Sequence, residues 1–269
     1  MKKWWMSVFL LTTGLIVSVL LLIGFLQAAS AVLKPNGLDN ANYEKEEEAH
    51  EKTEDDGKLS IVALGDSLTR GIGDDSGEGY VKRLTHILKD EYGQDISLAN
   101  LSVTGAKTAD LASLLKTSGA KHAVSKADVI VMTIGGNDLF PGVEGLTAEN
   151  LAAYEPDTET FEANSRQILE ELRKENEDAP IYWISLYNPF EDLTILGDTS
   201  QFVIDWNYQL QRLASEYKNL VIIPVFDLFQ GQVKEFLYTD HFHPNAKGYE
   251  AIAERLTQAI VSQQQLREE

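Results

Sequence analysis

The chain has 269 residues, a formal net charge of -19 at pH 7 and no cysteine. A chain this acidic repels phosphate groups, so nucleic acid is not expected as a partner. The lack of cysteine excludes disulfides, thiolate metal sites and a lipidated amino-terminal cysteine. Composition therefore argues against nucleic-acid binding and thiol chemistry, and no protein partner is predicted.

The first 33 residues differ in composition from the rest. Two lysines precede an uncharged apolar run from Trp4 to Leu26. At ~1.5 Å per residue, roughly 23 helical residues reach across a ~30 Å hydrocarbon core, so residues 1–33 are predicted to form an uncleaved transmembrane anchor. Cleavage of a signal near Ala31, in the small-residue stretch Ala29-Ser30-Ala31, is the alternative. Both interpretations place the remainder of the chain outside the cytoplasm.

Residues 34–58 contain runs of acidic side chains and few apolar ones. Such a segment cannot bury enough surface to offset the entropy of ordering, so it is predicted to be a disordered, extended linker. Residues 59–264 then form one domain, since about 200 residues suffice for a single substantial core. Residues 265–269 are a polar tail.

Within the domain, apolar runs rich in valine and isoleucine alternate with helical patterns. The predicted strands are Leu59–Gly65, Ile96–Leu101, Asp128–Ile134, Pro180–Leu186 and Leu220–Val225. Apolar residues at helical spacing follow the strands, at Val81, Leu84 and Leu88; at Phe161, Ile168 and Leu172; at Val203, Trp206, Leu210, Leu213 and Tyr217; and at Tyr249, Ile252, Leu256 and Ile260. This alternation predicts a three-layer α/β/α sandwich around a five-stranded, mainly parallel sheet.

The carboxyl ends of parallel strands meet at one edge of a sheet, and the segments that follow these strands carry unusual residues. The first strand runs into Gly65-Asp66-Ser67-Leu68-Thr69, which places a serine at the edge where open α/β sheets bind ligands. Taken alone, Gly-Asp-Ser is equally typical of an ordinary turn or helix cap. The residues after the other strands are therefore needed to decide.

A base for Ser67 lies near the carboxyl terminus, in Asp240-His241-Phe242-His243-Pro244. A neutral imidazole can remove the serine proton, and Asp240 can orient His243 through its far ring nitrogen. Pro244 disfavours helix at His243 and is itself a good first helical residue, so His243 is expected in a loop just before the last helix. If this segment is extended, His241 points elsewhere.

Three groups are candidate donors to the oxyanion of a tetrahedral intermediate. These are the backbone N–H of Ser67, the backbone N–H of Gly105 and the side-chain amide of Asn137. Gly105 follows the second strand, and Asn137 follows the third in Gly135-Gly136-Asn137-Asp138. Each of these glycines and asparagines is, by itself, also a common turn residue.

Together these four blocks resemble the SGNH hydrolases, also called the GDSL lipase and esterase family, over about residues 59–260. The general look is closest to the bacterial lysophospholipase and thioesterase branch. The resemblance implies a flavodoxin-like sandwich, a catalytic triad of Ser67, Asp240 and His243, an oxyanion hole from Ser67, Gly105 and Asn137, and no cofactor. An α/β-hydrolase is disfavoured, because its serine follows several strands in Gly-x-Ser-x-Gly.

The expected function is that of an extracytoplasmic serine esterase or lipase-type acylhydrolase acting on carboxylic esters, with thioesters as a further possibility. A carbohydrate or cell-wall O-acetylesterase with the same triad is one alternative, and a non-catalytic binding module is another. Asp240, His241 and His243 also form a compact cluster of metal-binding residue types. The segment is short and no other block offers further ligands, so we predict no metal. Residues 139–141 and 187–190 are candidates to line an acyl site, although they can equally pack a loop onto the core.

Overall fold

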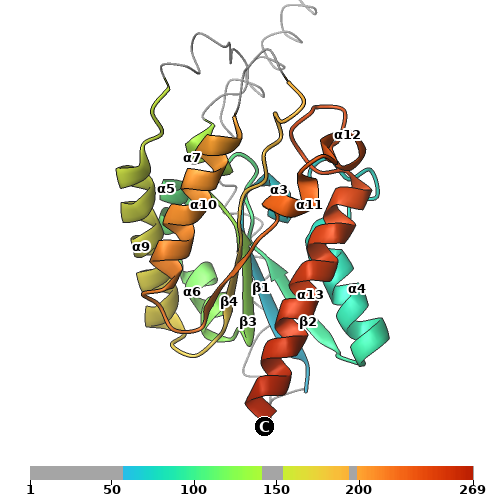
Figure 1. The fold of residues 1–269 in the computed structure, drawn as a ribbon. Coiled ribbons are helices and arrows are strands. Elements are labelled where there is room, and N and C mark those ends of the chain that lie inside the picture. Colours follow the sequence, from blue (N-terminus) through green and yellow to red (C-terminus); the bar gives the residue numbers. More distant parts are fainter. Residues whose placement is uncertain (1–56, 141–153, 194–198, 269) are drawn as a thin grey trace, which may run out of the picture. The chain divides into compact units, whose positions relative to one another are not determined.

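The computed structural model describes residues 57–140, 154–193 and 199–268 (Figure 1). The predicted anchor and nearly all of the predicted linker lie outside these residues. All five predicted strands are present, with ends up to two residues shorter than expected: β1 (Leu59–Gly65), β2 (Ile96–Asn100), β3 (Val129–Thr133), β4 (Ile181–Ile184) and β5 (Leu220–Ile223). They form one sheet in the order β2-β1-β3-β4-β5, with every pair parallel.

This strand order is that of the flavodoxin-like doubly wound fold and confirms the prediction. From β1 the chain first crosses to β2 on one side and later returns to β3 on the other, so the order reverses between β1 and β3. Ligands of such sheets bind outside the carboxyl ends of the strands at this reversal. Ser67 follows β1 and Asn137 follows β3, so both residues lie at that place.

Helices cover both faces of the sheet and complete the three layers (Figure 1). One face is covered by α5 (Thr108–Leu114), α6 (Ser118–Ser125), α9 (Thr158–Glu175) and α10 (Ser200–Ala214). The other is covered by α4 (Gly79–Tyr92) and α13 (Ala246–Glu268), with the short α11 (Phe226–Phe229) and α12 (Val233–Phe236). Two further short helices, α3 (Ser67–Arg70) and α7 (Gly136–Leu139), follow β1 and β3 directly.

The predicted apolar stripes are the inner faces of these helices. The residues predicted on α4, α9 and α13 are all buried, and so are those on α10 except Tyr217, which follows the end of the helix and is partly buried. Each stripe packs against strands that are apolar on both faces, because the central strands β1, β3 and β4 lie between two helical layers. The edge strands β2 and β5 have one neighbour each and are only partly buried.

Across the described ranges, none of the helices combines the length and apolar character needed to cross a bilayer. The apolar run from Trp4 to Leu26 is outside those ranges. Helix α13 continues to Glu268, beyond residue 264 at which the sequence places the end of the domain.

Candidate active site

The turn after β1 presents Ser67 through a close approach of two backbones. Gly65 has φ +122°, and a Cβ on it would lie 1.8 Å from the carbonyl oxygen of Thr133 on the neighbouring strand. Only glycine fits there. Asp66 then caps α3 by accepting a hydrogen bond from the N–H of Leu68, at 3.0 Å, so Ser67 is the first helical residue. The serine is thus held by the core of the sheet, and only 3% of its surface is exposed.

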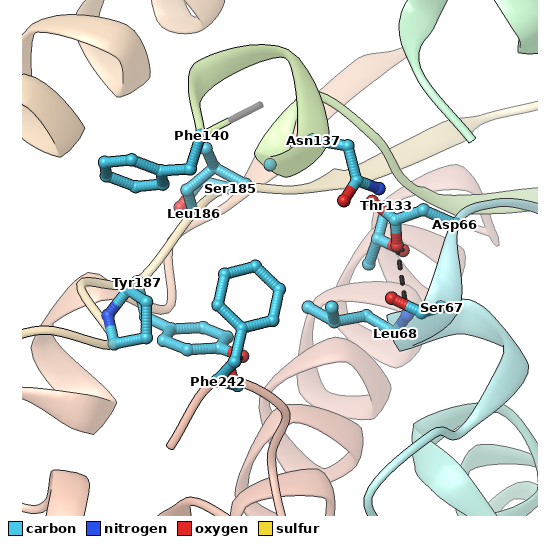
Figure 2. A pocket seen from close by; sticks show the side chains of 12 residues that line it. Asp66, Ser67, Leu68, Thr133, Asn137, Phe140, Ser185, Leu186, Tyr187 and Phe242 are labelled. Atoms are coloured by element: carbon cyan, nitrogen blue, oxygen red, sulfur yellow. Dashed lines mark hydrogen bonds between the residues drawn. The ribbon is translucent and has the colours of Figure 1, made fainter. Parts of the chain in front are cut away.

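A buried hydrogen-bond network lies beneath this turn, and the sequence did not predict it. The hydroxyl of Thr133 donates to Asp66 Oδ1 at 2.8 Å (Figure 2). Thr69 donates to the carbonyl of Leu64 at 2.9 Å, and its hydroxyl oxygen lies 2.7 Å from those of Thr133 and Tyr80. Burial raises the pKa of Asp66 to about 7, against the opposing effect of its hydrogen bonds from Thr133 and Leu68.

The structure brings Ser67, His243 and Asp240 together, although 176 residues separate the serine from the histidine. Ser67 Oγ lies 2.8 Å from His243 Nε2, and His243 Nδ1 lies 2.7 Å from Asp240 Oδ2. An ionised carboxylate can only accept, so Nδ1 carries the proton and Nε2 is left to accept from the serine hydroxyl. This is the tautomer that a general base requires.

Asp240 is held in its ionised form. Partial burial opposes ionisation, but hydrogen bonds from the His243 ring and from the N–H groups of His243 and Phe242 outweigh it and lower the pKa of Asp240 below its usual value. The loop is not extended, because His241 has φ +53° and its N–H donates to the carbonyl of Tyr238. The side chain of His241 is no part of this hydrogen-bonded chain as the structure describes it.

His243 lies in a loop before α13, as predicted, but Pro244 is not the first helical residue. Pro244 pairs in an isolated bridge with Leu237. Asn245 caps the helix instead, since its Oδ1 accepts from the N–H groups of Lys247 and Gly248. The proline therefore fixes the loop rather than the helix, and the asparagine supplies the capping acceptor that proline lacks.

The three predicted oxyanion donors come from neighbouring loops. Within the described ranges, the backbone N–H groups of Ser67 and Gly105 donate to no backbone carbonyl. Asn137 donates one amide hydrogen to the carbonyl of Ala106 at 2.9 Å, which ties it to the residue beside Gly105. Among the residues that the structure describes, its second amide hydrogen has no acceptor, and Asn137 lines the same pocket as Ser67, where this hydrogen can meet a ligand.

A second contact, which the sequence did not reveal, joins these two loops. The Asp138 carboxylate accepts from the N–H of Thr108 at 3.0 Å and from its hydroxyl at 2.5 Å. Asn164 on α9 donates to the same hydroxyl at 3.1 Å. Burial raises the pKa of Asp138, although the bonds from Thr108 oppose this effect. Asp138 thereby fixes Asn137 relative to the loop that holds Gly105.

A pocket opens beside Ser67 and holds about 470 Å³ of empty space, counting the part open to solvent. Figure 2 shows apolar and aromatic side chains around it, including Leu68, Phe140, Leu186, Tyr187 and Phe242. Of the segments predicted to line an acyl site, Phe140, Tyr187 and Pro189 do so. Leu139, Asn188 and Phe190 are buried and do not line it, while Pro141 is outside the described residues. Phe242 also lines the pocket, although no role was predicted for it from the sequence.

The structure offers no support for a metal-binding role of the Asp240 loop. Within residues 57–140, 154–193 and 199–268, no three histidine, aspartate or glutamate side chains converge where they could hold a metal ion. Asp240 and His243 are already bonded to each other, and the histidine is bonded to Ser67.

Serine hydrolases use a serine hydroxyl, an imidazole and a carboxylate that are hydrogen-bonded in this order beside N–H donors for the oxyanion. The described residues show the same arrangement. A model of the GDSL-like lipase/acylhydrolase family matches residues 63–251. The chain belongs to this family, which confirms the resemblance seen in the sequence, and it is a serine hydrolase that acts on ester bonds.

The chain is also similar to individual relatives and solved structures. The chain is 32% identical to the uncharacterized protein YpmR of Bacillus subtilis, over 81% of this chain and 87% of the relative. It is 30% identical to the spore germination lipase LipC of Bacillus licheniformis, over 75% of this chain and 96% of the relative. Among solved structures, the lipase Lip_vut3 from a goat rumen metagenome matches with a TM-score of 0.65 and 28% identity, over 75% of this chain and 97% of that one.

Proposed function

We propose that the protein is an extracytoplasmic acylhydrolase that cleaves carboxylic esters with an apolar acyl group, using Ser67 as nucleophile, His243 as base and Asp240 to orient the base. One observation carries the proposal: the continuous hydrogen-bonded chain from Asp240 through His243 to Ser67, at 2.7 Å and 2.8 Å, lies beside a pocket with apolar walls.

In the proposed reaction, Ser67 Oγ attacks the acyl carbon while its proton passes to His243 Nε2. The negative charge on the carbonyl oxygen is met by the N–H groups of Ser67 and Gly105 and the amide of Asn137. The carbon–oxygen bond to the alcohol then breaks, and the alcohol leaves with the proton from His243. Water repeats the sequence on the acyl-enzyme, releasing the acid and restoring Ser67. Thioesters can react by the same steps, with a thiol as the leaving group.

The pocket supports an acyl group longer than acetyl. Its walls are formed mainly by side chains without charge, and aromatic rings of Phe140, Tyr187 and Phe242 contribute to them. A methylene group transferred into such surroundings gains ~0.8 kcal/mol, so each carbon that the pocket accommodates raises the affinity several-fold. The lipase name of the Bacillus licheniformis relative supports the same class of substrate.

The test is a rate series on p-nitrophenyl esters from acetate to palmitate, with the full-length protein and its Ser67→Ala variant. We expect a maximum of kcat/KM at medium or long chains and a fall to the uncatalysed background in Ser67→Ala. Ser102→Ala is the control, because Ser102 is a similarly buried serine at the same sheet edge whose hydroxyl donates to Asn100.

Two results would contradict the proposal. Full hydrolysis by Ser67→Ala would show that another group is the nucleophile. Activity confined to acetate esters would instead support the carbohydrate or cell-wall O-acetylesterase with the same triad.

The proposed location outside the cytoplasm depends on the apolar run from Trp4 to Leu26. If it anchors the protein, the full-length chain sediments with membranes and its domain is digested by protease added to intact protoplasts. Deletion of residues 1–33 then leaves the protein in the soluble fraction of the cytoplasm. Release of the full-length protein into the medium would support cleavage near Ala31, and protection from protease in intact protoplasts would overturn the proposal.

A further inference from the structure

Tyr187 connects the pocket wall to the loop that carries the base. It follows β4, is buried, and its ring stacks on that of Phe229 with 4.0 Å between centroids and 14° between planes. Its hydroxyl donates to the carbonyl oxygen of Phe242 at 2.6 Å, and Figure 2 shows its side chain beside that residue. The phenol is therefore aimed by its own packing at one backbone atom next to His243.

Phe242 lies between the acid and the base of the triad. Its N–H donates to Asp240 Oδ1 at 3.0 Å, and its ring meets that of His243 edge to face, with 5.1 Å between centroids. A displacement of the Phe242 backbone would consequently change the direction of the imidazole relative to Ser67.

The loop from Asp240 to His243 has few other attachments. It contains His241 at φ +53°, in the left-handed region that few residues other than glycine adopt. Among the described residues, only two side chains from outside this segment bond to residues 240–243, namely Ser67 and Tyr187. The Ser67 bond is lost when the serine attacks a substrate, so the bond from Tyr187 is the one of these two side-chain bonds that persists through the reaction.

Tyr187 remains a donor at every pH at which an esterase is assayed. Burial, followed by the nearby Tyr249, Asp66 and Asp240, raises the pKa of its phenol well above the ordinary value of 10. The bond to Phe242 is thus present in each protonation state of His243.

We propose that Tyr187 is a positioning residue for the catalytic base, which it holds in line with Ser67 through the Phe242 carbonyl. This inference rests on the function proposed above. Because the carbonyl is bonded to a side chain of the pocket wall, the wall and the base form one unit, and the imidazole keeps its place when the Ser67 hydroxyl is acylated.

The test is Tyr187→Phe, which removes the hydroxyl and keeps the ring that stacks on Phe229. We expect kcat on the best ester to fall about three- to tenfold, the range that corresponds to one net hydrogen bond, with KM within about twofold of wild type. Labelling of Ser67 by a small fluorophosphonate, which does not fill the pocket, should slow by the same factor. A shared decrease in these two rates reports on the base and not on substrate binding.

Tyr182→Phe is the matched control. Tyr182 is an equally buried tyrosine on β4 whose hydroxyl donates to Gln263 at 2.6 Å, away from the pocket beside Ser67. We expect it to lower the melting temperature as much as Tyr187→Phe does, while kcat and the labelling rate stay at wild-type values.

Three outcomes are informative. A wild-type kcat in Tyr187→Phe, measured well below its melting temperature, would overturn the positioning role even if Ser67→Ala is inactive. A rise in KM alone would also overturn it and make Tyr187 a residue of the pocket wall only. Hydrolysis by Ser67→Ala would refute the proposed function itself, so the two failures are distinguishable.

Discussion

The turn that carries Ser67 and the loop that carries His243 meet at 2.8 Å, yet the protein holds them in different ways. The serine turn is bonded to the buried network of Asp66, Thr69 and Thr133 between two central strands. The histidine loop lies near the surface, with 17% of the His243 side chain and 39% of the Asp240 side chain exposed. Its hydrogen bonds are mostly within residues 238–243.

This difference separates stability from catalysis. Changes beneath the serine turn remove buried polar partners and should destabilise the whole domain, because unsatisfied buried groups are costly. Changes in the histidine loop remove bonds near solvent and should affect the reaction while the fold persists. Three variants test this distinction, in decreasing order of expected effect.

The largest effect is expected from Asp240→Asn in the histidine loop. The amide can donate to Nδ1, which favours the tautomer with its proton on Nε2 and leaves Ser67 without a base. We expect kcat to fall about 10³- to 10⁴-fold while the melting temperature stays close to wild type. Asp205→Asn on the exposed side of α10 is the control, with unchanged rates. A large loss of stability in Asp240→Asn would contradict the idea that this loop is independent of the core.

The next effect concerns the pH dependence of stability, through Asp66 beneath the serine turn. Its pKa is about 7 in the folded protein and near 3.8 when unfolded. The folded protein favours the protonated Asp66 side chain, so the contribution of Asp66 to the free energy of unfolding is fully present below pH 4. Between pH 4 and 7 this contribution decreases, because the side chain ionises in the unfolded chain and not in the folded one, and it is lost once the pH passes about 7. We expect this to cost roughly 2–4 kcal/mol.

Urea unfolding from pH 4 to 8 measures the free energy of unfolding. In Asp66→Asn the side chain cannot ionise. We therefore expect the free energy of unfolding of the wild type to fall relative to that of Asp66→Asn as the pH rises across this range. A difference that is constant with pH would show that the Asp66 carboxylate keeps an ordinary pKa.

The smallest of the three effects is expected from Gly73→Ala, which places a methyl group against the backbone of the histidine loop. A Cβ on Gly73 would lie 2.6 Å from the Pro244 carbonyl oxygen and 2.8 Å from His243 Cβ. His243, the proposed base, must then move, and a shift of about 1 Å lowers kcat about 100-fold. Gly77→Ala is the control, because Gly77 also has a positive φ, +66° against +94° at Gly73, and has open space around it. Equal losses in the two variants would assign the effect to backbone strain alone.

Prediction from the sequence succeeded where a pattern is local or repeated. The strands were found because each is a continuous apolar run, and the helices because their stripes recur at helical spacing. The start of α13 was predicted two residues too early, at Pro244, because proline is a good first helical residue, whereas in the structure Pro244 pairs with Leu237 and Asn245 caps a helix that begins at Ala246. Thr133 and Phe242 were assigned no role, and Tyr187 only a place in the pocket wall, because threonine at a strand end and aromatic residues in loops usually signify packing alone.

The sequence by itself determined the doubly wound class of fold, the family, and the candidates Ser67, Asp240, His243, Gly105 and Asn137, because these depend on periodicity and on motifs that keep their order along the chain. Only the tertiary structure decided what surrounds those residues. Three contacts join segments that are far apart in sequence: the bond from Thr133 to the buried Asp66, the bonds from Thr108 to Asp138, and the bond from Tyr187 to Phe242. The first belongs to the buried surroundings that raise the pKa of Asp66. Such contacts are fixed by how the strands are ordered in the sheet, and no local pattern of residues records them.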